Sequence, residues 1–182
     1  MILDIKRVDI LSDNDKKKLL GIERNKRKVL ARWEAIQKDE SLSETEKDFV
    51  PLNNEIEFTK NYIELQQMRL TDKVSVVFNT SGITDDLQIA PLLFIPFVEN
   101  AFKYGVSTKE ATTIDIQIHA TGNQIEFNAT NTVATNISTH LDSTGIGINN
   151  AKRRLALLYP GSYQLNISNQ DNTYQVSLKI NS

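Results

Sequence analysis

The sequence predicts an α+β domain: a two-layer α/β sandwich in which helices pack on one face of a mostly antiparallel mixed sheet. Three observations lead to this prediction. Apolar and polar residues alternate strictly in several segments, as in strands that are buried on one face only. Other segments carry apolar residues at the three- and four-residue spacing of amphipathic helices. The segments follow in the order helix, strand, helix, two strands, long loop, helix, two strands, which fits an α+β layer arrangement.

Composition indicates one globular domain with a helical extension at its N-terminus. The chain has 182 residues, of which 40% are hydrophobic and 24% are charged, and this balance suits a packed core. The net charge of -2 gives no overall field that would attract nucleic acid, so we expect no nucleic-acid partner. With no cysteine and only two histidines, the sequence excludes disulfides, thiol catalysis and an ordinary zinc site.

Residues 1–47 predict a helical segment that precedes a domain at 48–182. A narrow apolar stripe, interrupted by a lysine, follows helical spacing; it consists of Leu19, Ile22, Lys26, Val29, Trp33 and Ile36. The stripe either packs on the chain's own domain or forms a dimer seam, and both alternatives stay open. The basic run Arg24–Lys28 favours a solvated helix face over a nucleic-acid patch.

The first elements of the domain are a helix and a strand. Residues 55–70 carry amphipathic spacing behind an Asn53-Asn54 pair, which predicts a helix capped by an asparagine. The β-branched run at 74–78 predicts a strand. Pro91 suits the first position of the next helix, and Pro96, inside it, predicts a kink or a restarted first turn.

The second half of the chain changes period. The alternating runs 113–120 and 124–130, joined through Gly122-Asn123, predict an antiparallel hairpin. Residues 131–144 are polar and aperiodic, which predicts a mobile loop. A helix should follow Gly145 and stop at Pro160, and two strands around a turn at 169–172 should close the fold.

The helix at 94–105, "FIPFVENAFKYG", carries the first candidate site residues. Asn100, Lys103 and Tyr104 share one face because they lie three and four positions apart, and Glu99 borders that face. An amide oxygen can ligate a hard cation and a lysine can neutralise phosphate, so the group suits a magnesium-nucleotide. The alternative is a simple surface pair of Glu99 with Lys103.

A second element strengthens the nucleotide interpretation. Gly145-Ile146-Gly147 follows a polar loop and precedes a helix, so its backbone N–H groups and the positive helix end can face an anion. In this order along the chain, the loop would close over phosphates as a lid.

The motifs "PLLFIPFVENAFKYG", "TGIGINNAKRRLALLYP" and "FVPLNNEIEFTKNYIELQQMRL" together resemble the ATP-binding half of sensor histidine kinases of the LytS/YehU type. This group belongs to the larger ATPase group that includes gyrase and MutL. The resemblance runs from about residue 49 to residue 180. It implies ATP and Mg²⁺ as cofactors, bound between the sheet and the helices under the loop.

The resemblance also implies individual roles. Asn100 would hold the magnesium ion, Glu99 would act as a base or positioning group, and Lys103 would approach the phosphates. The catalytic residues are then Glu99, Asn100 and Lys103, and the nucleotide-binding residues are Asn100, Lys103, Tyr104, Thr130, Asn131, Gly145, Ile146, Gly147 and Asn150.

Two features depart from the family's pattern. Thr130, Asn131 and Thr132 take the place of an Asp-Asn-Gly box whose Asp receives the adenine amino group, so we expect Thr130 to offer a weaker neutral acceptor. Tyr104 replaces a frequent histidine.

The phosphate-accepting histidine box is also missing, because residues 1–47 contain no histidine. We expect His119, in a strand, and His140, in the loop, to be structural or solvated. The chain is then either a fragment of a kinase or carries a first segment unrelated to kinases.

The resulting expectation is the catalytic domain of a two-component histidine kinase that donates the γ-phosphoryl group of ATP to a histidine outside residues 1–47. Its partners would be a phosphoacceptor histidine domain and a response regulator, with a homodimer in the full-length protein. The longest uncharged apolar stretch, 89–98, is half of the ~20 residues that a bilayer crossing needs, so we expect a cytoplasmic domain of an inner-membrane sensor. Two alternatives stay open: a non-catalytic interaction or dimerisation module, and an ATP-hydrolysing or serine-phosphorylating enzyme of the same fold.

Overall fold

The computed structural model describes residues 49–107, 110–133 and 145–182. All of them belong to the second of the chain's two compact units, Ser43–Ser182. The helical segment expected at 1–47, most of the expected loop at 131–144 and His140 lie outside the described residues.

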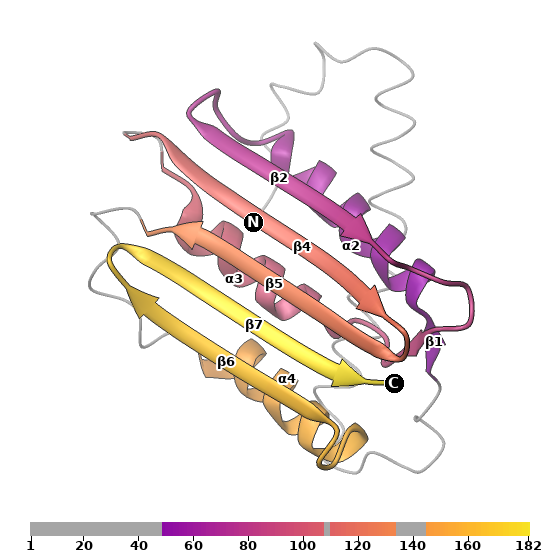
Figure 1. Cartoon of the computed structure of the whole chain (residues 1–182). Helices are drawn as coiled ribbons and strands as arrows, with labels where there is room; N and C mark the ends of the chain where they lie inside the picture. Colours follow the sequence, from indigo (N-terminus) through magenta and orange to yellow (C-terminus); the bar gives the residue numbers. More distant parts are fainter. Residues whose placement is uncertain (1–48, 108–109, 134–144) are drawn as a thin grey trace. The chain divides into compact units, whose positions relative to one another are not determined.

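A five-stranded sheet forms one layer of the domain, with strand order β2-β4-β5-β7-β6 (Figure 1). Its strands are β2 (Val74–Ser81), β4 (Thr112–Thr121), β5 (Gln124–Thr132), β6 (Tyr163–Gln170) and β7 (Thr173–Asn181). β2 is parallel to β4, and the other neighbouring strands are antiparallel. The predicted hairpins β4–β5 and β6–β7 are therefore confirmed.

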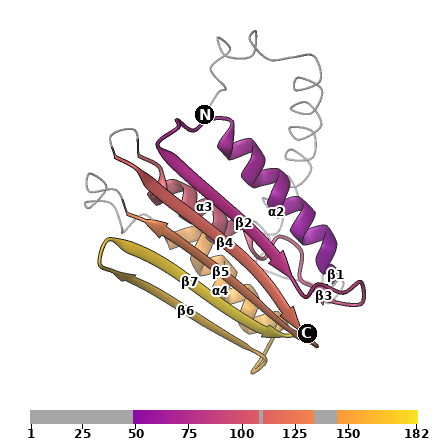
Figure 2. The same cartoon turned by 45° about the horizontal axis from the view of Figure 1, so that its top comes forward.

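Three helices form the other layer: α2 (Leu52–Gln67), α3 (Ile95–Gly105) and α4 (Gly145–Leu158). All three lie on the same face of the sheet, where α3 contacts β4, β5 and α4 (Figures 1 and 2). The predicted fold, helices on one face of a mostly antiparallel mixed sheet, is confirmed.

Strict alternation along the central strands separates the two faces of this sheet. In β4 the buried residues Ile114, Ile116 and Ile118 alternate with more exposed ones, and β5 and β7 repeat the pattern. Because successive side chains of a strand point to opposite faces, one face is apolar and packs on the helices. The other face carries polar side chains.

The expected start of α3 at Pro91 is wrong, because the helix begins at Ile95. Residues 91–94 form turns in which Leu92 has a φ of 58°, a left-handed conformation that no α-helix contains. Pro96 therefore lies in the first turn, where its missing N–H costs no helical hydrogen bond. This is the restarted first turn that the sequence allowed.

The asparagine cap expected for α2 is also wrong. The helix begins at Leu52, and no side chain makes a capping hydrogen bond at its N-terminus. Asn53 lies inside the first turn, and its Nδ2 donates to Oδ1 of Asp85 at 2.8 Å instead. The sequence also did not reveal the short antiparallel pair of β1 (Val50–Pro51) with β3 (Gln88–Ile89), which ties the start of α2 to the segment before α3.

Gly105, the last residue of α3, marks where the helix comes closest to the sheet. A Cβ at this position would lie 2.8 Å from Cγ1 of Ile114 and 2.9 Å from Cβ of Asn131. Real Cβ atoms do not approach other carbons this closely, so only glycine lets α3 end against β4 and β5.

We predict that Gly105→Ala lowers the free energy of unfolding by about 1–3 kcal/mol, because the added methyl group must push the helix off the sheet. Urea denaturation measures this change. The control is Gly122→Asn in the β4–β5 turn, where a Cβ meets nothing within 4 Å and the φ of 56° is one that asparagine tolerates. Equal stability of Gly105→Ala and the wild-type protein would contradict the close approach.

Candidate functional site

Polar side chains from α3, β5 and β7 meet at one end of the buried face. Asn131 of β5 is paired in the sheet with Tyr174 of β7 and packs beside Gly105 at the end of α3. The ring centroids of Tyr104 and Tyr174 are 6.5 Å apart. The apolar rows of the sheet therefore end in an asparagine and a tyrosine just where α3 contributes Asn100 and Tyr104.

Three of these buried side chains have a polar atom with no hydrogen-bond partner. The atoms are Nδ2 of Asn100, the hydroxyl of Tyr104 and Oδ1 of Asn131. Asn131 uses its Nδ2 to donate to the carbonyl of Thr132 at 3.2 Å, which leaves Oδ1 as an acceptor. An unpaired buried polar group costs ~1–3 kcal/mol, so such a cluster indicates a site whose partner comes from outside the chain.

Electrostatics link the same residues. Burial raises the pKa of the Tyr174 hydroxyl, and the neighbouring Tyr104 raises it further. The amide of Asn100 lies close enough to the Tyr174 hydroxyl to lower this pKa in part, although its Nδ2 makes no hydrogen bond of good distance and angle. Asn100 and Tyr174 thus border the same buried space from α3 and β7.

The start of α4, with Gly145 and Gly147, lies on the Asn100 side of α3. A Cβ at Gly147 would lie 3.9 Å from Cβ of Pro96, so this part of α4 contacts the first turn of α3. Pro96 and Asn100 are four residues apart and share a helix face. Gly145 and Ile146 begin α4, and Asn150 is half-buried in its second turn.

Glu99 borders a different element from Asn100. The pKa of Tyr62 on α2 is raised by burial and then by the negative charge of Glu99, so this carboxylate lies near the Tyr62 hydroxyl. Lys103 is exposed, and its Nζ lies 5.1 Å from the centroid of the Tyr104 ring. The structure therefore brings Lys103 to the Tyr104 side and directs Glu99 toward α2.

Thr130 does not join the cluster. The helix-facing residues of β5 are Ile125, Phe127, Ala129 and Asn131, so Thr130 projects from the opposite face. The sequence prediction ended this strand at residue 130 and placed Asn131 in the loop, but β5 runs to Thr132, so the alternation continues and Asn131 faces the helices. Alignment by motif alone selected the neighbouring residue.

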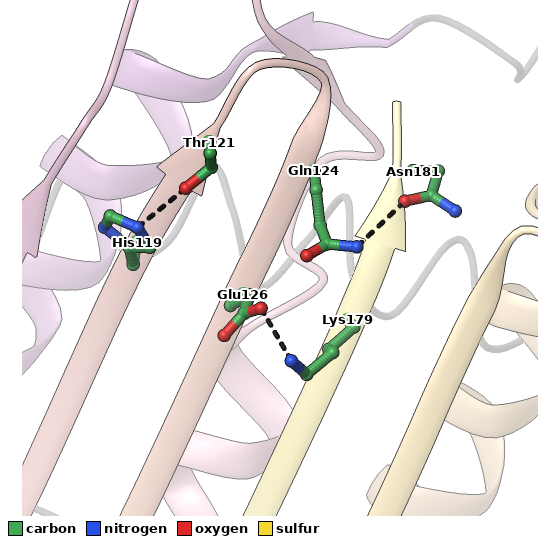
Figure 3. A network of polar contacts seen from close by, with 6 residues as sticks. All are labelled: His119, Thr121, Gln124, Glu126, Lys179 and Asn181. Carbon is green, nitrogen blue, oxygen red and sulfur yellow. Dashed lines mark hydrogen bonds and ion pairs between the residues drawn. The ribbon is translucent and has the colours of Figure 1, made fainter.

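The outer face of the sheet is held by polar links between strands (Figure 3). Nζ of Lys179 lies 2.6 Å from Oε1 of Glu126, and Gln124 donates to Asn181 at 3.3 Å. Exposed pairs of this kind contribute ~0–1 kcal/mol each. This face carries no apolar row, which explains why none of the helices within the described residues covers it.

His119 lies on this outer face. Its Nε2 lies 2.8 Å from the Thr121 hydroxyl (Figure 3). Its Nδ1 lies 2.8 Å from the Ser81 hydroxyl. Both ring nitrogens are thus engaged in local hydrogen bonds, as expected for a structural histidine.

The donor set at the Asn100 end suits a nucleotide better than a protein-held metal cluster. Among residues 49–107, 110–133 and 145–182, no three histidine or acidic side chains lie close enough to hold a metal ion. Mg²⁺ typically takes one or two protein oxygens together with substrate phosphates, and the amide of Asn100 can supply one.

The described helices include none that is long and apolar enough to cross a membrane.

We predict that Tyr104→Phe leaves the free energy of unfolding unchanged or raises it by up to about 1 kcal/mol, since the hydroxyl it removes has no partner. The matched variant is Tyr159→Phe, whose hydroxyl accepts the N–H of Ala90 at 2.8 Å. That change should cost about 1–2 kcal/mol in thermal or urea unfolding. Equal losses in both variants would mean that the Tyr104 hydroxyl is hydrogen-bonded within the protein.

Comparison with known proteins finds similar sequences and similar structures. Residues 28–74 match the family model described as histidine kinase. A relative, sensor protein LytS of Oceanobacillus iheyensis, is 32% identical over 79 residues, which are 43% of this chain and 14% of that protein. The chain therefore spans only a small part of the length of this relative.

Solved structures share the fold at low sequence identity. The nucleotide-free catalytic domain of histidine kinase ThkA matches with a TM-score of 0.53 and 15% identity, over 74% of this chain and 95% of that one. Histidine kinase AdeS of Acinetobacter baumannii matches with a TM-score of 0.51 and 15% identity, over 74% of this chain and 66% of that one.

Full-length ShkA in complex with AMPPNP has a TM-score of 0.52 and 15% identity, over 73% of this chain and 31% of that one. These matches confirm the resemblance drawn from the sequence motifs: part of the chain is similar to sensor protein LytS, and its described domain shares the fold of histidine kinase catalytic domains.

Proposed function

We propose that residues 48–182 are the ATP-binding catalytic domain of a two-component sensor histidine kinase. The observation that supports this function best is the cluster of unpartnered buried polar atoms on Asn100, Tyr104 and Asn131. These atoms lie between α3 and the sheet, on the side of α3 that Gly147 of α4 contacts. A fold-only role would give no reason to leave these atoms unpaired.

The available atoms match the chemistry of a nucleotide. Oδ1 of Asn131 can accept a hydrogen bond from the adenine amino group, and this assigns to Asn131 the role that the motif alignment gave to Thr130. The similar ShkA structure contains the nucleotide analogue AMPPNP, which supports the same ligand class here. The affinity lost with a neutral acceptor in place of a carboxylate is about tenfold.

The phosphate end would involve α3 and the start of α4. Asn100 would hold Mg²⁺, and the Lys103 ammonium would approach the phosphate oxygens. Backbone N–H groups of residues 145–147 and the positive end of α4 would face the same oxygens, with Asn150 one turn further on. ATP would supply the γ-phosphoryl group, and Glu99 would orient the attacking group if its carboxylate leaves Tyr62.

The reaction requires a partner histidine, because residues 1–47 contain none and both nitrogens of His119 are engaged. We assign the acceptor to a histidine domain elsewhere in the parent system, which would pass the phosphoryl group to a response regulator. We also propose that the full-length protein is a homodimer. In it, this domain would be the cytoplasmic domain of an inner-membrane sensor protein. The best support for the non-catalytic alternative was Thr130 in place of an acidic adenine acceptor, and we assign a neutral acceptor to Asn131 instead.

We predict that Asn100→Ala weakens Mg-ATP binding at least tenfold, because it removes the metal-holding amide. Isothermal titration calorimetry measures the dissociation constant. The control is Asn166→Ala on the exposed side of β6, which should bind as the wild-type protein does. Unsaturable binding by the wild-type protein, or equal binding by Asn100→Ala, would remove the basis of the proposed function.

A second pair of variants tests the adenine contact. Asn131→Ala should weaken ATP about tenfold, because it removes the acceptor for the amino group, whereas Thr130→Val on the outer face should have no effect. Comparison of ATP with GTP, which lacks that amino group, should show that Asn131→Ala reduces the preference for ATP. A loss caused by Thr130→Val alone would reverse this assignment.

A further inference from the structure

Glu55 on α2 holds the segment that leads into α3. This side chain is buried, with 2% of its surface exposed. Its Oε2 accepts the backbone N–H of Leu92 at 2.7 Å, and its Oε1 accepts that of Phe94 at 3.2 Å. Each oxygen of this carboxyl group thus accepts one backbone N–H from the segment immediately before Ile95, where α3 begins.

The same segment is held from α4. Nη2 of the buried Arg154 donates to the carbonyl of Pro91 at 2.9 Å. The Tyr159 hydroxyl, just after α4, accepts the N–H of Ala90 at 2.8 Å. Residues 90–94 are therefore fixed by side chains of two helices that are distant in the sequence.

The backbone conformation of this segment depends on such support. Leu92 has a φ of 58°, and a left-handed conformation is unfavourable for a residue with a Cβ. Conformations of this kind persist where the surrounding structure imposes them, and they cluster at functional sites. Without the Glu55 acceptor, the N–H groups of Leu92 and Phe94 would be buried and unpaired.

We propose that Glu55 is a positioning residue for the site on α3: by binding residues 92 and 94 it fixes where α3 begins, and thereby where Asn100 lies. Asn100 is only five residues beyond Ile95 in a rigid helix, so a displaced first turn displaces its amide. The role of Asn100 toward ATP rests on the proposed function, but the positioning of α3 does not.

The charge of Glu55 makes this hold depend on pH. Burial raises the pKa of Glu55 to about 7, against the lowering effect of the backbone N–H groups and of the Arg154 charge. Tyr159 faces the same carboxyl group, and its own pKa is raised by burial to about 12. Arg154 stays cationic and Tyr159 stays neutral near pH 7, so neither changes charge there.

The sign of the dependence follows from linkage. A state in which the segment opens and water reaches Glu55 restores the ordinary pKa of about 4.5, so the open state releases a proton more readily than the closed one. Raising the pH from about 4.5 to about 7 therefore favours opening. Above pH 7 the effect levels off.

Amide hydrogen exchange of the wild-type domain tests this directly. Protection factors of the Leu92 and Phe94 amides should fall on the order of tenfold between pH 5.5 and 7.5, after correction for intrinsic exchange. Glu55→Gln should abolish this pH dependence and lower the protection, because the Gln amide presents an N–H to one of the two donors. Glu57→Gln, at an exposed position of α2, is the matched control and should keep the wild-type slope.

The side-chain amide signals of Asn100 in NMR spectra report the consequence for the site. They should shift in Glu55→Gln and not in Glu57→Gln, and Mg-ATP binding should weaken about tenfold only in the former. Unchanged protection of the Leu92 and Phe94 amides in Glu55→Gln, or unmoved Asn100 signals, would overturn the positioning role, and a flat wild-type slope would overturn its pH dependence. If the wild-type protein binds no Mg-ATP, the proposed function fails, while the exchange and Asn100 signals still decide whether Glu55 positions α3.

Discussion

The alternation of buried and exposed residues along β4, β5 and β7 is the constraint on which this domain depends. It produces one apolar sheet face that must be covered, and the helices cover it. The Phe94 ring stacks on Phe127 of β5 at a centroid distance of 4.7 Å, and Phe97 lies 5.9 Å from the same ring. Burying each of these side chains contributes roughly 1.5–3 kcal/mol, so α3 is anchored to the sheet chiefly by apolar contacts.

Helix α3 contributes both to the apolar core and to the candidate site. Over its first turns α3 is apolar because it lies on the middle of the sheet, where β5 presents Phe127 and Ala129. Near the C-terminal end of α3, the sheet presents Asn131 and Tyr174 instead, and the helix contributes Asn100 and Tyr104 to the same region. The rigid packing of the apolar part keeps these polar groups in place although their own hydrogen bonds are incomplete. A bound partner is the simplest source of the missing bonds.

Buried polar side chains also hold the backbone segment that precedes α3. Glu55, Arg154 and Tyr159 satisfy the backbone of a segment that forms neither helix nor strand, and such a segment cannot be buried without partners. They connect α2 and α4 to the start of α3.

Hydrophobic period and turn residues are local properties, so the sequence predicted the three helices, the five strands of the main sheet, their order, the single covered face of that sheet and the family resemblance. It also singled out Asn100 and the glycine turn. The packing of the layers was needed to show that Asn131 rather than Thr130 faces the helices at Asn100, that α3 begins at Ile95 rather than Pro91, and that Asn53 binds Asp85 instead of capping α2. It was also needed to show the hydrogen bonds of Glu55, whose partners lie 37 and 39 residues away. Contacts between distant segments depend on how the layers pack, and no local pattern encodes that distance.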